Sequence, residues 1–172
     1  MVFELTDLGR SLFDQGYDAL AIEALDYLER VAGPQAVDEF AAELTAKVIA
    51  RYDEIRARGE EPVAALVEAL NSEGFVASLA PAPSGLQICL HHCPVSRVAV
   101  RFPQLCQAET AAFARVLGSH VQRLATIAHG DGVCTTHIPR PVSADSVSTS
   151  SVSTSSVSTS STGDLGRGKV TA

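Results

Sequence analysis

The chain has 172 residues, a formal net charge of −7 at pH 7 and a sequence pI near 5.1. The length suits one ordinary domain, and the acidic balance argues against an autonomous nucleic-acid-binding protein, because such binding depends on Lys and Arg side chains that neutralise phosphates. Because the chain has no run of about eighteen apolar residues and its acidic first residues do not fit a signal peptide, we expect a cytoplasmic protein without a membrane-spanning helix.

The first residues predict a short strand that leads into a helix. Phe3 and Leu5 alternate with Glu4, and Thr6 can cap the following helix because its hydroxyl can accept a backbone N–H group. A strand this short has no partner nearby, so we expect a pairing element to belong upstream of it.

Three helices are predicted next, over residues 18–33, 34–58 and 61–75. Gly33 is suited to end the first of them and Pro34 to begin the second. The second has about 24 residues and a length of roughly 36 Å, which is more than a small core needs, so we expect it to support a dimer. The residues expected to face inward are Leu20, Ala24, Tyr27, Leu28 and Val31, then Val37, Phe40, Ala41, Leu44, Val48, Tyr52 and Ile55, then Leu66, Val67 and Leu70.

The apolar pattern changes its period after the third helix. The predicted elements there are strands at Phe75–Leu79 and Leu86–His91, a turn at Cys93–Pro103, a helix over residues 104–118, and strands over residues 120–128 and 133–139. A tight turn is expected at Gly130–Gly132 between the last two strands. The pattern as a whole predicts an α+β fold, with N-terminal helices that include one long dimerisation-type helix, followed by a small antiparallel sheet with a helix.

The last thirty or so residues have a different composition from the rest. The pentapeptide SVSTS occurs at residues 146, 151 and 156. Such a segment lacks aromatic residues and has little charge, so it cannot bury enough apolar surface to offset the entropy lost on ordering. We therefore expect residues 141–172 to form a disordered Ser/Thr/Val repeat tail.

Three of the four cysteines lie in three different predicted elements. Cys93 follows a strand, Cys106 lies in the first turn of a helix, and Cys134 lies in the last strand. These positions can bring the three sulfur atoms to one point, and the helix dipole favours a thiolate in the first turn. Because cytoplasmic cysteines are mostly reduced, the cluster of thiols indicates metal or redox chemistry rather than a disulfide.

The spacing of these cysteines does not by itself select one kind of site. Twelve residues separate the first two and twenty-seven the last two, unlike the tight pairs of structural zinc sites or the spacing of bacterial ferredoxins. Buried thiols without a ligand, a metal or iron–sulfur site, a disulfide and a catalytic thiol all remain open.

Neighbouring polar residues add little specificity. A thiol enzyme needs a base beside its nucleophile; His120, His129 and His137 are available, but no local sequence indicates such a pair, and only His91 and His92 adjoin a cysteine. The basic residues of this part of the chain are interpreted as ordinary surface. They are Arg97, Arg101, Arg115 and Arg123.

Residues 90–139 carry a long motif, HHCP…FPQLC…HGDGVCTTH. This segment closely resembles the C-terminal part of the actinobacterial SufR family, and the resemblance extends more loosely back to residue 3. SufR proteins are iron–sulfur-dependent transcriptional repressors of the suf cluster-assembly operon, related to ArsR- and DeoR-type winged-helix regulators.

The resemblance implies a sensor rather than an enzyme. Cys93, Cys106 and Cys134 match the three cysteines that hold the family's iron–sulfur cluster, which would be [4Fe-4S] or [2Fe-2S]. The cluster-loaded repressor binds the suf promoter, and iron starvation or oxidative or nitrosative stress releases it. A homodimer is implied as well.

The resemblance also implies a division of the chain. Residues 1–13 would be the remnant of a winged-helix wing and its following helix, residues 14–73 a helical linker and dimerisation region, and residues 74–140 the cysteine-bearing sensory domain. The recognition helix would lie upstream of Met1, so we expect operator binding only where that missing domain is present.

Three cysteines leave one ligand position of a cluster to be filled. The candidates are Cys89, His91, His92, Glu109 and solvent. An alternative to the sensor is a zinc-stabilised structural or protein-interaction domain, in which the three cysteines act together with His91 or His92.

Overall fold

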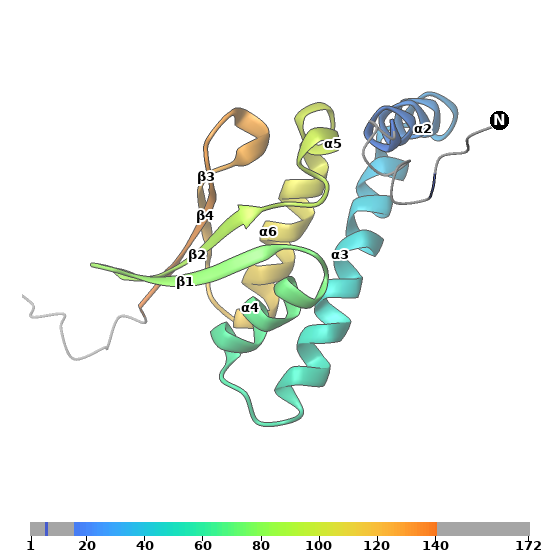
Figure 1. Cartoon of the computed structure of the whole chain (residues 1–172). Helices are drawn as coiled ribbons and strands as arrows, with labels where there is room; N and C mark the ends of the chain where they lie inside the picture. Colours follow the sequence, from blue (N-terminus) through green and yellow to red (C-terminus); the bar gives the residue numbers. More distant parts are fainter. Residues whose placement is uncertain (1–5, 7–15, 141–172) are drawn as a thin grey trace, which may run out of the picture. The chain divides into compact units, whose positions relative to one another are not determined.

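The computed structural model describes Thr6 and residues 16–140 of the chain. The predicted strand at Phe3–Leu5 and its following helix, and the predicted disordered tail over residues 141–172, lie outside the described residues. The described part combines helices with a four-stranded antiparallel sheet, which confirms the predicted α+β class (Figure 1). Within it, no helix is both long enough and apolar enough to cross a membrane.

The elements follow one another closely along the chain. They are α2 (Tyr17–Ala32), α3 (Pro34–Arg56), α4 (Pro62–Ser72), β1 (Val76–Ala82), β2 (Gly85–His92), α5 (Ser96–Arg101), α6 (Gln104–Leu117), β3 (Gln122–Ala125), the 3-10 helix η1 (Ile127–His129) and β4 (Cys134–Pro139).

The boundaries of the first helices follow from local chemistry. Gly33 separates α2 from α3 with a φ of 87°, a backbone conformation that glycine adopts without steric cost. Pro34 is the first residue of α3 and Pro62 the first of α4, positions where the missing N–H would have no helical partner. These starts and the end at Gly33 agree with the sequence prediction.

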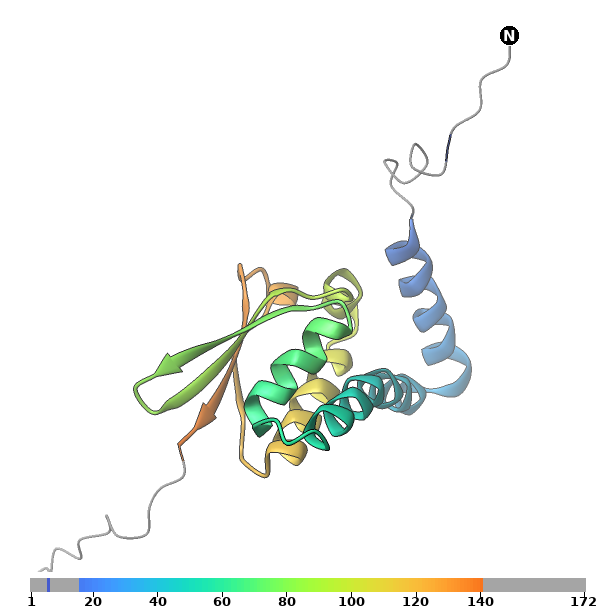
Figure 2. The ribbon, with the colours of Figure 1, turned by 60° about the horizontal axis from the view of Figure 1, so that its bottom comes forward.

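The sheet has the strand order β1-β2-β4-β3, and every pair is antiparallel. Figure 2 shows α4 and α6 on one side of the sheet, with α3 beside them, and α3 contacts both of these helices. The main core fills the space between these helices and the inner face of the sheet. Its residues include Tyr52 and Ile55 of α3, Leu66 and Leu70 of α4, Phe113 of α6, Ile88 and Leu90 of β2, and Cys134 and Ile138 of β4.

A second core cluster joins α2 and α3 to the segment between β2 and α6. It includes Leu25 of α2, Val37 and Ala41 of α3, Val98 and Phe102, and Leu105 of α6. The prediction of a turn throughout Cys93–Pro103 is wrong, because residues 96–101 form the helix α5 and bury Val98 and Ala99. A helix of six residues is too short for an apolar period to be recognised in the sequence, and this one packs against both α2 and η1.

The predicted inner face of α2 is right for Leu28, which packs on the core, and wrong for three of the other residues. Leu20, Tyr27 and Val31 are 64%, 58% and 57% exposed, whereas Leu25 is buried. The residues of α2 that pack beside Leu25 on the core are Ala21, Ile22 and Leu28. The helix carries apolar residues on two faces, and its contacts with α3 and α5 decide which of them is covered.

The predicted strand over residues 120–128 is shorter than expected. β3 ends at Ala125, and η1 follows it. The Thr126 hydroxyl accepts the backbone N–H of His129 at 3.2 Å, and the Asp131 carboxylate accepts the N–H of Thr126 at 2.8 Å. These side chains offer the backbone partners that replace a strand ladder, so the tight turn expected at Gly130–Gly132 is part of a longer connection.

Candidate metal centre

The three predicted ligand cysteines occupy the elements that the sequence predicts. Cys93 directly follows β2, Cys106 lies in the first turn of α6, and Cys134 is the first residue of β4. Cys93 and Cys134 are buried, with 7% and 4% of their surface exposed, and Cys106 is partly buried. All four cysteines, including Cys89, carry free thiols.

The register of the sheet separates the fourth cysteine from this group. Leu90 pairs with Cys134, and Cys89 pairs with Thr135. Neighbouring residues of a strand point to opposite faces, and Leu90 and Cys134 both belong to the buried core. Cys89 therefore lies on the outer face of the sheet, opposite to the face that carries Cys134.

Burial raises the pKa of two of the three thiols, those of Cys93 and Cys106. Burial raises the pKa of Cys93 to about 12, a hydrogen bond from the backbone of Val95 acts in the opposite direction, and the charges of Glu109, Cys134 and Cys106 raise the pKa further. Each of these three neighbouring groups therefore makes the Cys93 thiolate less favourable.

Cys106 is influenced by Glu109 and Cys134 as well, and in addition by the positive charge of Arg123. Burial and the charge of Glu109 raise its pKa, the Arg123 guanidinium lowers it, and the charge of Cys134 raises it. The positive charge of Arg123 therefore stabilises a thiolate at Cys106, and the carboxylate of Glu109 destabilises it.

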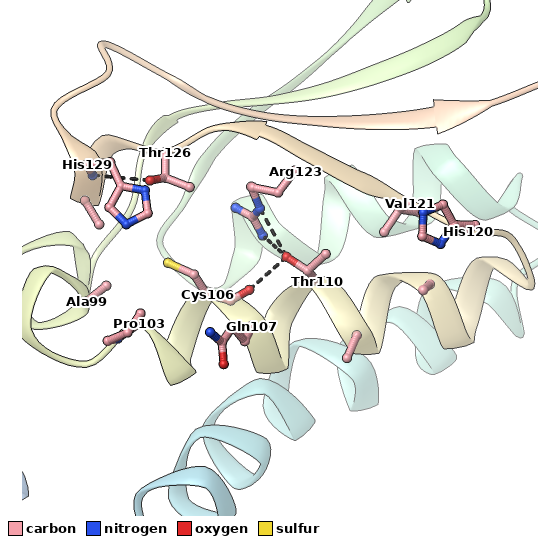
Figure 3. Close-up of a pocket in the computed structure, with 13 residues that line it drawn as sticks. Ala99, Pro103, Cys106, Gln107, Thr110, His120, Val121, Arg123, Thr126 and His129 are labelled. Atoms are coloured by element: carbon pink, nitrogen blue, oxygen red, sulfur yellow. Dashed lines mark hydrogen bonds between the residues drawn. The ribbon is translucent and has the colours of Figure 1, made fainter.

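Arg123 is the residue that connects the sheet to the helix of Cys106. Its Nη2 donates to Glu109 Oε1 at 2.7 Å, and these two side chains are only 13% and 11% exposed. The guanidinium also donates to the hydroxyl of Thr110, which in turn donates to the carbonyl of Cys106 at 2.8 Å (Figure 3). Burial lowers the pKa of Arg123, but Glu109 and the charges of Cys106 and Cys134 outweigh this effect and raise it.

The sequence interpretation of Arg123 as ordinary surface is therefore wrong. Its strand places Arg123 inward and the apolar Leu124 outward, with 54% of Leu124 exposed. This order is the reverse of the usual pattern of apolar residues inside and polar residues outside. No local signal identifies the partner, because Glu109 belongs to a different element.

Two of the sulfur atoms interact with backbone N–H groups. The N–H of Ile127 donates to Cys134 Sγ at 3.2 Å, and the backbone at Val95 bonds to Cys93. Such hydrogen bonds stabilise a negatively charged sulfur, and they tune the potential of iron–sulfur clusters where a cluster is bound.

The candidates for a fourth ligand are distributed unequally around the thiols. His91 is exposed, and its Nε2 lies 2.9 Å from the hydroxyl of Ser78, which pairs with Cys89 in the sheet. His92 is exposed at the end of β2. Glu109 is buried and acts electrostatically on Cys93 and Cys106. Of these residues, Glu109 is the one on the same helix as a predicted ligand, three residues after Cys106 on α6.

Over the described residues, no group of three or more His, Cys, Asp or Glu side chains is placed so that it could hold a metal ion as it stands. A cavity of about 510 Å³ lies beside Cys106 (Figure 3). Its wall is formed by α5, the loop before α6, α6 and the segment from His120 to His129. The lining residues are Ala99, Pro103, Cys106, Gln107, Thr110, Ala111, Ala114, His120, Val121, Arg123, Thr126, Ala128 and His129.

Comparisons of this chain with protein-family models, with curated protein sequences and with solved structures found no match. The function proposed for the chain therefore depends on the cysteine site and on the motif over residues 90–139.

Proposed function

We propose that this chain is the cluster-binding sensory part of a transcriptional repressor of the SufR type, and that Cys93, Cys106 and Cys134 hold an iron–sulfur cluster. The observation that carries the proposal is the placement of the three cysteines. Thr126 and Ala128, on either side of the Ile127 N–H that donates to Cys134 Sγ, line the same cavity as Cys106, and Cys93 comes three residues after Leu90, the sheet partner of Cys134. Thiolates are the preferred ligands of iron–sulfur clusters.

The residues around the thiols fit such a group. Each cysteine would bind a different iron of a cluster, so the three sulfur atoms do not have to meet at one ion. The site offers hydrogen bonds to Cys93 and Cys134 and a cation, Arg123, beside Cys106. These features compensate part of the negative charge of thiolates that are removed from water. A bound cluster would supply a centre sensitive to iron supply and to oxidants.

Ligation would change the state of the chain's own residues. Without a metal, burial favours the protonated thiol of Cys93; ligation requires that its proton leave. Bound cysteines would also link the end of β2, the start of α6 and the start of β4, and loss of these links would release the three elements. Such a change can regulate a second site only if ligation favours one conformation over another.

The second part of the proposal concerns partners. We propose a cytoplasmic homodimer in which the exposed face of α2 meets a second copy. This face carries Tyr17, Leu20, Tyr27 and Val31, each more than half exposed, and contiguous apolar surface of this kind is typical of association sites. Operator DNA would be a partner only in a chain that also carries the winged-helix domain.

The direct test is anaerobic reconstitution of the full chain with ferrous iron and sulfide. We expect a brown protein with visible absorbance and with iron and acid-labile sulfide in similar amounts. A colourless protein that binds one zinc ion per chain would replace the sensor by a zinc-stabilised domain. Rapid alkylation of a single cysteine together with turnover of a substrate would replace it by a thiol enzyme.

A further inference from the structure

The cavity beside Cys106 has the size of a small-molecule site. Its volume of about 510 Å³ lies within the range of roughly 300–1,000 Å³ that is usual for ligand pockets. Figure 3 shows the side chain of Cys106 on α6 near the segment that carries Thr126 and His129, with Arg123 above Thr110. The cavity therefore adjoins the proposed cluster site rather than a separate part of the fold.

The three cysteines are not equally accessible from this cavity. Cys106 belongs to its wall, whereas Cys93 and Cys134 do not. Cys93 and Cys134 are also the two that are buried, with 7% and 4% exposure. A molecule that enters from solvent through the cavity therefore reaches the thiol group at Cys106 first.

The wall of the cavity favours uncharged molecules. Small apolar side chains form much of it, and they are Ala99, Ala111, Ala114, Val121 and Ala128. Its one guanidinium, that of Arg123, already donates hydrogen bonds to Glu109 and Thr110. An ion that entered would exchange much of its water for these apolar side chains, which is costly, and the other titratable side chains of the wall are His120 and His129.

We propose that this cavity is an access path through which small uncharged molecules reach the cysteine site at Cys106. The physiological role of this path rests on the proposed function. In a chain that holds a cluster, the molecules that travel along the path would be small uncharged reactants such as dioxygen or nitric oxide. Charged reactants of similar size are selected against at the same wall.

The path itself can be tested on the metal-free full chain. Iodoacetamide and iodoacetate have nearly the same size but differ by one negative charge; with both, the cysteine sulfur forms a bond to the CH2 carbon and iodide leaves. The extent of reaction at each cysteine is followed over time by peptide mass spectrometry. We expect Cys106 to react several-fold faster than Cys93 and Cys134. We also expect a preference of Cys106 for iodoacetamide over iodoacetate that is larger in the folded chain than in urea.

Two variants obstruct the cavity and one serves as a control. Ala111→Phe and Gln107→Phe place an aromatic ring at exposed positions of the wall, and we expect each to slow alkylation of Cys106 several-fold. Ala50→Phe makes the same change at an exposed position of α3 outside the wall, and it should leave the rate unchanged. Circular dichroism confirms that each variant is folded.

The outcomes separate this inference from the proposed function. Unchanged Cys106 rates in both folded wall variants would overturn the access path, and so would equal selectivity for the two reagents in the folded and unfolded chain. Neither result depends on a cluster. Conversely, a chain that fails to take up iron and sulfide but shows the expected alkylation pattern would overturn the cluster proposal and leave the cavity as a path to a reactive thiol.

Discussion

Arg123 on β3 and Glu109 on α6 form an ion pair of 2.7 Å in which both side chains are nearly buried. The pair connects a strand and a helix that are separate in the sequence, and Arg123 also reaches Thr110, whose hydroxyl donates to the carbonyl of Cys106. A buried pair contributes little when it replaces an apolar contact, but removal of one partner leaves an uncompensated charge.

We therefore predict that Arg123→Gln destabilises the metal-free protein by about 3–5 kcal/mol. The free energy of unfolding from urea titrations measures this loss. The double variant Arg123→Gln with Glu109→Gln should recover a large part of it, because the carboxylate that lost its partner is then neutral. Arg51→Gln is the matched control, since the exposed pair of Arg51 with Glu54 is expected to contribute only about 0–1 kcal/mol. Equal losses for Arg123→Gln and Arg51→Gln would contradict the buried-pair account.

A second prediction concerns the pH dependence of stability in the metal-free chain. The Cys93 thiol loses its proton near pH 9.0 in the unfolded chain and near pH 12 in the folded one, where burial disfavours the thiolate. The contribution of this thiol to stability is thus complete below pH 9.0 and declines as the pH rises toward 12. Urea titrations at several pH values should show a steeper decline for the natural chain than for Cys93→Ala. Parallel declines for the two chains would mean that the fold does not raise the pKa of Cys93.

The third prediction assigns different roles to the four sulfur atoms. After anaerobic reconstitution, Cys93→Ser, Cys106→Ser and Cys134→Ser should each lose most of the bound iron and sulfide. Cys89→Ser should retain them, because Cys89 lies on the outer face of the sheet while Cys134 belongs to the core. Loss of iron and sulfide in Cys89→Ser, with the fold intact by circular dichroism, would place Cys89 among the ligands and contradict the assignment.

A fourth prediction concerns the contact between β2 and β4. A Cβ atom added at Gly85 would lie 2.0 Å from the carbonyl oxygen of Ile138, so the two strands would have to separate. We expect Gly85→Ala to destabilise the chain by about 1–3 kcal/mol, the usual cost of overpacking. Gly132→Ala is the control, because nothing lies within 4 Å of its added Cβ, and it should change stability by less than about 0.5 kcal/mol. Thermal unfolding compares the two, and a neutral Gly85→Ala would show that the strands adjust freely.

The fifth prediction tests the proposed dimer. Leu20→Glu combined with Tyr27→Glu places two carboxylates on the exposed face of α2, and charged groups in an apolar contact are costly. Sedimentation equilibrium should show a dimer for the natural chain and a monomer for the double variant. Glu23→Gln, on the same helix, should remain dimeric. If the natural chain is a monomer at all accessible concentrations, the dimer proposal is wrong.

Much of the fold can be predicted from local patterns in the sequence. Gly33, Pro34 and Pro62 mark helix boundaries because their backbone chemistry limits them to such places. The inward face of α4 follows from the spacing of Leu66 and Leu70, both of which are fully buried. These features depend on residues that are close in the chain, so the sequence contains the information directly.

Other features depend on contacts between distant segments, and the sequence alone did not predict them. The buried face of α2 is decided by α3 and α5, so the apolar stripe of Leu20, Tyr27 and Val31 indicated the wrong side. The candidate site likewise combines features that local sequence predicts with features that depend on contacts between distant segments. The elements that carry Cys93, Cys106 and Cys134 could be predicted, but the pairing of Arg123 with Glu109 requires the packing of β3 on α6.

The pairing of Leu90 with Cys134 has a consequence for how such a site can change in evolution or by design. Side chains along a strand alternate between its two faces, so a shift by one residue exchanges the side chains that face the core with those that face outward. Insertion or deletion of one residue in β2 would exchange Cys89 and Leu90 between the two sides without altering a single proposed ligand in the motif. The proposed centre is therefore sensitive to strand length as well as to residue identity, so a change of length in β2 or β4 would disturb it as a substitution of a cysteine would.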